Sequence, residues 1–106
     1  MISRTKVVTI SEQLLPDARK WLRRSSTALD DEIQQTIEAC LMDMSNAGIT
    51  RIDGEDSLIK QAVKSHLRGN FDYDDHPERW LEAYKCLKAS LSLSSDYTGT
   101  VEVANE

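Results

Sequence analysis

The chain has 106 residues, 40% of them hydrophobic and 29% charged, with a formal net charge of −5. This length allows a single domain with one core, and the composition is that of a globular protein rather than a disordered chain. The acidic balance argues against a free protein built to grip nucleic acid, and the chain lacks the run of about 18 apolar residues that a membrane span needs.

The first ten residues alternate loosely in polarity, and we expect them to form an extended or loose N-terminal arm. The first helix is predicted over residues 15–24, because Pro16 lacks an amide hydrogen and fits best in an opening turn. Four cations of this helix form a candidate basic contact patch: Arg19, Lys20, Arg23 and Arg24. The patch suits DNA phosphates or an acidic surface of a partner. The alternative is a solvated helix end, where cations interact favourably with the helix dipole.

A second helix is predicted over residues 30–46. Three carboxylates mark its start, Asp30, Asp31 and Glu32, where negative charge offsets the positive end of the dipole. Apolar residues then recur at helical spacing and form one stripe: Ile33, Ile37, Cys40, Leu41 and Met44. Gly48 follows as the residue that stops the helix.

Two further helices are predicted over residues 55–69 and 76–92. Gly69 and Asn70 tolerate the left-handed conformation that ends a helix, so they mark the exit from the first of the pair. The turn between the two helices is short, and they should therefore pack as an antiparallel hairpin.

The start of the last helix is marked twice. Pro77 fits a first turn, where its missing amide hydrogen costs nothing, and Asp75 and Glu78 have the spacing of a capping box. The predicted fold is therefore all-α, a small four-helix bundle with a C-terminal antiparallel helical hairpin and flexible termini. Its predicted core comprises Ile33, Ile37, Leu41, Leu58, Ala62, Val63, Leu67, Trp80, Tyr84, Leu87 and Leu91.

Serines interrupt the helical pattern after Leu91, because their hydroxyls compete for backbone hydrogen bonds. We therefore expect one domain over residues 1–106, with an N-terminal arm (1–10), a helical core (11–92) and a flexible C-terminal tail (93–106).

No catalytic, metal-binding or cofactor-binding residues are predicted. Cys40 and Cys86 lack the paired spacing of a zinc site and are interpreted as small buried or half-buried residues. His66 and His76 have no ligand partner at i+3 or i+4, and helix capping explains the carboxylates before Pro77 better than a calcium loop does. No nucleophile elbow or phosphate-cradling glycine loop is present, so an enzyme is not expected.

The order of residues along the hairpin and its exit carries a second signal. The stretch runs from Leu58-Ile59 and Ala62-Val63, through Gly69-Asn70-Phe71-Asp72-Tyr73-Asp74-Asp75, to Glu78-Arg79-Trp80, Ala83-Tyr84, Leu87-Lys88 and Ser90-Leu91-Ser92-Leu93-Ser94-Ser95-Asp96-Tyr97. Together with Asp30-Asp31-Glu32, Ile33, Ile37, Ala39 and Gly48-Ile49, it resembles the head–tail connector (adaptor, or head completion) proteins of tailed bacteriophages. The resemblance covers residues 17 to 97; Pro16 and the linker from Ser25 to Leu29 depart from the family pattern.

This resemblance implies a structural virion protein at the head–tail interface, assembled in the host cytoplasm. It implies a ring of about a dozen copies that forms beneath the portal protein after DNA packaging, extends the DNA channel and docks the tail. The implied partners are the portal protein, a tail-side connector (stopper) protein, further copies of the chain, and passing double-stranded DNA bound without sequence specificity; no membrane is implied. Four residues match the family pattern at the exit and form the candidate subunit or portal interface: Ser92, Ser94, Ser95 and Tyr97.

Two other functions stay open at this point. One is a small acidic helical regulator that binds a single protein partner. The other is a DNA reader that uses the basic first helix, whose binding would weaken steeply with salt.

Overall fold

Four long helices and one short helix make up the computed structural model, which describes residues 2–71 and 73–99. The helices are α1 (Arg4–Trp21), α2 (Asp30–Asn46), α3 (Ser57–Asn70), α4 (Pro77–Ser92) and α5 (Ser95–Thr98). Neither described range contains a strand. The predicted all-α class and the arrangement of four long helices are confirmed.

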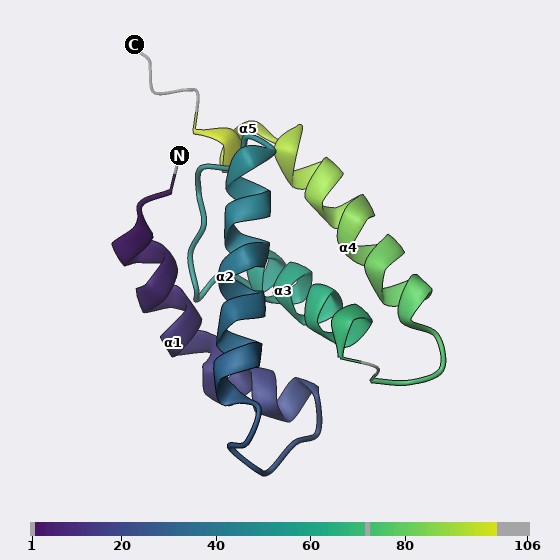
Figure 1. The fold of residues 1–106 in the computed structure, drawn as a ribbon. Coiled ribbons are helices and arrows are strands. Elements are labelled where there is room, and N and C mark those ends of the chain that lie inside the picture. Colours follow the sequence, from purple (N-terminus) through teal and green to yellow (C-terminus); the bar gives the residue numbers. More distant parts are fainter. Residues whose placement is uncertain (1, 72, 100–106) are drawn as a thin grey trace.

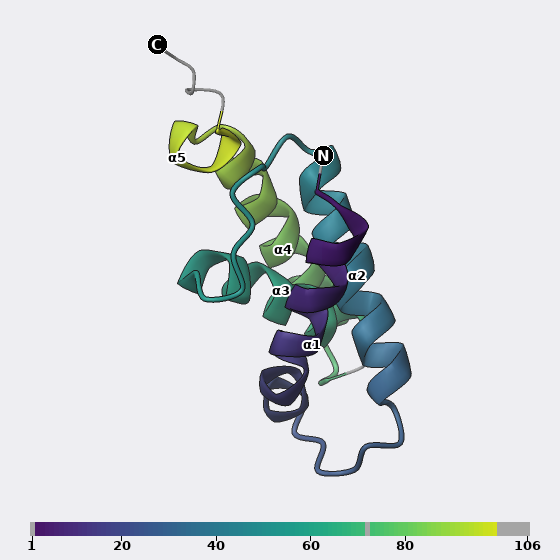
Figure 2. The same cartoon turned by 90° about the vertical axis from the view of Figure 1, so that its left-hand side faces the viewer.

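The helices are arranged with α2 and α3 in the middle of the molecule. α1 packs against α2 and α3, whereas α4 packs chiefly against α3 and α5. α1 and α4 therefore lie on opposite sides, with α2 and α3 between them (Figure 1). Figure 2 shows the same arrangement from the α1 side.

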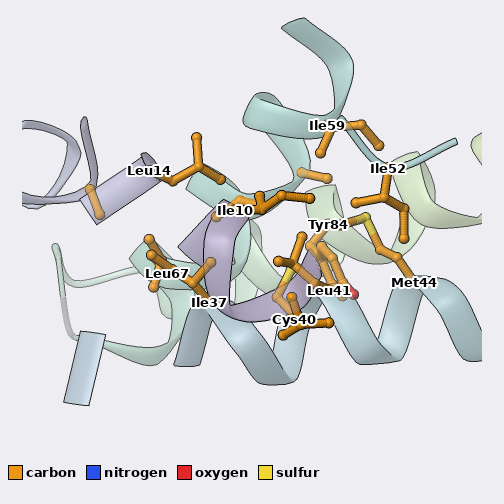
Figure 3. Close-up of a cluster of buried hydrophobic side chains, with 14 of the residues drawn as sticks. Ile10, Leu14, Ile37, Cys40, Leu41, Met44, Ile52, Ile59, Leu67 and Tyr84 are labelled. Carbon is orange, nitrogen blue, oxygen red and sulfur yellow. The ribbon is translucent and has the colours of Figure 1, made fainter. Parts of the chain in front are cut away.

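A single hydrophobic core joins all four long helices. Fully buried side chains from α1, α2 and α3 meet there, with Leu14, Leu41 and Ile59 among them, and Tyr84 reaches in from α4 (Figure 3). Each of these side chains lies on the apolar stripe of its helix, so the period of 3.6 residues per turn determines which residues face the core.

The hairpin of α3 and α4 is confirmed, but its close packing has a cause that the sequence did not reveal. Gly69 is helical and α3 continues through Asn70, so the prediction that these two residues form a left-handed exit was wrong. A Cβ atom at Gly69 would collide with the side chain of Leu81 in α4. Glycine is therefore needed here for the close approach of two helices rather than for a turn.

The prediction for the N-terminal segment was also wrong. α1 begins at Arg4, capped by Ser3, whose side chain accepts a hydrogen bond from the amide of Lys6. Residues 4–10 are helical, and both Val7 and Ile10 are buried. Pro16 thus lies in the helix interior, where it costs about 3 kcal/mol. The apolar stripe that α1 buries outweighs that cost, because each buried aliphatic side chain contributes about 1.5–3 kcal/mol.

Two further predictions, for the end of α2 and for the start of α4, had different outcomes. Gly48 has φ +97° and follows the last turn of α2, which confirms it as the residue that stops this helix. The capping box of Asp75 and Glu78 does not form. Instead Asp74 accepts hydrogen bonds from the amide of His76 and from the indole nitrogen of Trp80.

The predicted core was right for most of its members and wrong for three. Leu58 is 43% exposed and Ile59 is buried in its place, whereas the other predicted core residues of α3 are buried. Trp80 and Leu87 are only partly buried. Cys86 is exposed rather than half-buried. Core residues that were not predicted include Val7, Ile10, Leu14, Ala18, Leu22, Ile49 and Ile52.

Candidate functional site

The predicted exit after α4 forms a fixed turn. Ser94 precedes α5, and the backbone carbonyl of Tyr97 accepts hydrogen bonds from the amides of Thr50 (2.8 Å) and Arg51 (3.0 Å). The Tyr97 hydroxyl donates to both carboxylate oxygens of Asp56, at 3.1 and 2.9 Å. α5 is thereby held against the segment that links α2 to α3, and the part of the predicted tail that the structure describes, residues 93–99, is ordered against the bundle.

The electrostatics of this contact follow from its geometry. Partial burial opposes ionisation of Asp56, but hydrogen bonds from Tyr97 and from the amides of Ile59 and Leu58 outweigh it and hold the pKa of the Asp56 carboxyl below its usual value. Burial and the neighbouring Asp56 raise the pKa of the Tyr97 hydroxyl, which therefore remains a donor at neutral pH.

The three serines of the candidate interface differ in exposure. Ser95 is exposed, whereas Ser92 and Ser94 are half-buried, and the Ser92 hydroxyl donates to the carbonyl of Ala89. Tyr97 uses its hydroxyl within the chain. The accessible part of this exit is therefore centred on Ser95 and on the exposed edge of α5.

The candidate basic contact patch lies at the other end of the molecule, where α1 ends (Figure 1). Arg19 makes a bidentate pair with Asp30 at 2.9 and 2.8 Å, which joins the end of α1 to the start of α2. This hydrogen bonding raises the pKa of the Arg19 guanidinium and lowers that of the Asp30 carboxyl. Arg19 therefore serves the fold.

The other three cations of the patch remain exposed around a shallow hollow that also includes Pro16 and Ser25. Arg23 has φ +57° and ends α1 in the left-handed region, and its guanidinium lies 5.5 Å from the centre of the Tyr73 ring. Within residues 2–71 and 73–99, neither Lys20 nor Arg24 forms an ion pair.

Arg68 connects this end of α1 to the hairpin. Its guanidinium lies 4.1 Å from the ring centre of Tyr73 and 4.7 Å from that of Trp80, and its Nε donates to the carbonyl of Trp21 at 3.0 Å. A planar cation suits such stacked contacts. The partly exposed Trp80 thus packs against Arg68 and is not free to act as an independent anchor.

A polar cluster lies beneath α4. Asp43 of α2 accepts hydrogen bonds from the Tyr84 hydroxyl (2.6 Å) and from the Lys88 ammonium (2.8 Å). The His66 ring packs edge-on against Tyr84 at 4.8 Å, and its Nδ1 is buried without a hydrogen-bond partner among the described residues. Burial lowers the pKa of His66, so the imidazole is neutral at pH 7.

The outward side of α4 is the functional candidate that the sequence interpretation missed. Exposed residues follow one another along it in a single row, named here the outer face of α4: Glu78, Glu82, Cys86, Ala89 and Leu93. The spacing of this row was visible in the sequence. It was not singled out because the search for apolar periodicity found the buried stripe of the same helix.

Among the described residues, no group of three or more His, Cys, Asp and Glu side chains could hold a metal ion. Burial raises the pKa of the Cys40 thiol to about 12, which keeps it protonated and unreactive. In the part of the chain that the structure describes, no helix is long and apolar enough to cross a bilayer.

Comparison with known proteins gives one match. A family described as phage connector protein matches residues 14–98, which include all of α2 to α5 and the second half of α1. No curated protein and no solved structure matches the chain.

Proposed function

This chain belongs to the phage connector protein family, and from that premise we propose that it is the adaptor that forms a ring beneath the portal protein. It is a component of the phage head–tail junction, and its role is structural. In this proposal the ring extends the DNA channel and gives the tail-side stopper protein a place to dock, after assembly in the host cytoplasm. The observation that carries the proposal is the match across residues 14–98.

The properties of the fold support a role in assembly. A chain of 106 residues buries a limited share of its surface, so association with neighbours would add substantially to its stability. The described surface contains exposed rows of side chains rather than an enclosed catalytic pocket, and heterologous contacts between such surfaces close into cyclic rings.

The exit around α5 is the proposed contact with the portal. Ser95 is accessible, and the Tyr97–Asp56 hydrogen bonds fix its position on the body of the subunit. A contact surface that is already ordered loses less conformational entropy on binding. Ser92, Ser94, Ser95 and Tyr97 thus act together, with Tyr97 positioning the other three.

The overall charge supports a channel wall that DNA passes without adhering. A net charge of −5 repels the phosphate backbone over most of the surface. A DNA reader would instead need several cations directed at phosphates.

Light scattering after size exclusion tests this proposal, using the full chain alone and mixed with purified portal particles. We expect a portal complex that contains many copies of the chain and appears as an added ring in electron micrographs. A monomeric chain that fails to join the portal at micromolar concentration contradicts the proposal. A one-to-one complex with a different protein would favour the regulator, and salt-sensitive duplex binding would favour the DNA reader.

A further inference from the structure

No other helix of the described residues covers the outer face of α4, where the side-chain contacts are local ones, Glu78 with His76 and Cys86 with Glu82. α4 is 16 residues long and buries only Tyr84 and Leu91. All five residues of its outer face are exposed, and the last, Leu93, is 87% exposed. The row is acidic at its start, at Glu78 and Glu82, and apolar towards its end, at Cys86, Ala89 and Leu93. An exposed helix face of this mixed character is typical of an interface whose partner is absent.

The basic hollow at the end of α1 has the opposite charge and is a separate surface of the molecule. Lys20, Arg23 and Arg24 are exposed there, although the chain carries 18 acidic side chains that could have paired with them. α1 packs against α2 and α3, whereas α4 packs chiefly against α3, and the basic hollow approaches the hairpin at the turn before α4, where Arg23 lies against Tyr73 (Figure 1). The exposed outer face of α4 takes no part in that contact.

We propose that the outer face of α4 in one subunit docks onto the basic hollow of α1 in the next copy of this chain. The inference rests on the proposed ring and identifies its subunit contact. Two different surfaces of one molecule produce a head-to-tail contact, which can repeat around a closed ring. A self-complementary pair of surfaces on one side would instead stop at a dimer.

Charge complementarity favours a second copy as the occupant of this face. Glu78 and Glu82 are one helical turn apart and form the acidic part of a shallow surface that also includes Arg79 and Ala83. Arg79 lines the same surface and Lys85 is also exposed beside it, so the negative charge of the row is local to Glu78 and Glu82. Complementary charges determine the orientation of subunits more than they determine affinity. We therefore expect the acidic start of the row to set the register and the apolar end to contribute buried area.

Charge reversal tests the contact, with ring formation on purified portal as the readout. Glu82→Lys alone and Lys20→Glu alone should each weaken subunit incorporation about tenfold or more, because each places like charges together. The double variant should recover incorporation. Glu32→Lys makes the same charge change at an exposed position of α2 outside both surfaces and should leave incorporation unchanged.

Site-directed cross-linking provides an independent readout. Cys86 supplies a native thiol on the outer face, while Cys40 is buried and does not compete. With Arg24→Cys, oxidation of portal-bound rings should yield a ladder of disulfide-linked multimers on a non-reducing gel. Gln61→Cys, exposed on α3 and outside both surfaces, should give none.

The outcomes separate this inference from the proposed function. If rings form on the portal, but charge reversal has no effect and Arg24→Cys gives no ladder, the subunit contact lies elsewhere and the adaptor function stands. If the unmodified chain forms no ring, the proposed function itself is wrong. Loss of incorporation in the single variants without recovery in the double variant also overturns the inference, provided that their circular dichroism spectra match the unmodified chain.

Discussion

α2 and α4 are similar in length but differ in what they bury. Of the 17 residues in α2, five are buried in the core, whereas α4 buries only two of 16. α1 and α3 cover the apolar stripe of α2. Because α2 lies between them, the fold depends on this helix. α4 is bound along one side only. The comparison indicates that α2 holds the subunit together and that α4 is positioned to join it to something else.

Removing a core side chain from α2 should have the largest effect. Leu41 is fully buried, and Leu41→Ala should lower the free energy of unfolding by about 2–5 kcal/mol through lost burial and a cavity. Urea denaturation followed by circular dichroism measures this. The matched control is Leu93→Ala on α4, which should change stability by less than about 0.5 kcal/mol. An equal loss in the control would mean that Leu93 packs within the subunit.

Separating α3 from α4 should have the next largest effect. Gly69→Ala would improve helix propensity by up to about 1 kcal/mol, but the new methyl group collides with Leu81, and overpacking costs about 1–3 kcal/mol. We expect net destabilisation in thermal unfolding. The double variant Gly69→Ala with Leu81→Ala removes the collision with the side chain, while the backbone nitrogen of Leu81 stays 3.2 Å from the new methyl group. Gly69→Ala should therefore lower the melting temperature less in the Leu81→Ala background than in the unmodified chain.

Loosening α5 should have a smaller and more local effect. Tyr97→Phe removes both hydrogen bonds to Asp56, a partly exposed carboxylate that water can solvate instead, so the loss should not exceed about 1 kcal/mol. Hydrogen exchange should accelerate at the amides of Thr50 and Arg51, which bond to the Tyr97 carbonyl. Ser95→Ala is the control. Unchanged exchange at these amides in Tyr97→Phe would show that backbone contacts alone hold α5.

Lowering the pH from 7 to 5 should have the smallest effect on stability. It should act at the contact between α4 and the rest of the bundle. The folded pKa of His66 is lowered by burial, so the unfolded chain binds the proton more tightly and stability falls as the pH drops through about 6.5. His66 faces Asp43, Tyr84 and Lys88, and Asp43 partly offsets the effect of burial. The carboxylates with lowered pKa lose their stabilising contribution only as the pH falls below about 4. His66→Gln should flatten the stability profile between pH 7 and 5.

The sequence predicted the structure correctly where a residue's role depends on its neighbours along the chain. The spacing of Ile33, Ile37 and Leu41 predicted α2, and Gly48 marked its end. The start of α1 could not be predicted, because the local penalty at Pro16 is outweighed by tertiary burial of Val7 and Ile10.

Tertiary contacts also explain the other differences. Gly69 depends on Leu81, twelve positions further along, and Tyr97 depends on Asp56; neither pairing has a signature in local spacing. The candidate surfaces were predicted in part. The basic patch and the exit were identified by residue type, but the pairing of Arg19 with Asp30 leaves only three cations of the patch accessible.

The two ends of the described chain are tied to the last turn of α2 and to the segment that follows it. The amide of Ile2 donates to the Ser45 hydroxyl, and the carbonyl of Tyr97 accepts from Thr50 and Arg51. Any peptide or fluorescent protein fused before Ile2 or after Gly99 would therefore emerge on the same side as the proposed portal contact. An insertion in the loop between α1 and α2, exposed at residues 25–28 and situated at the far end (Figure 1), would leave that side free but would lie beside the basic hollow, which Ser25 lines.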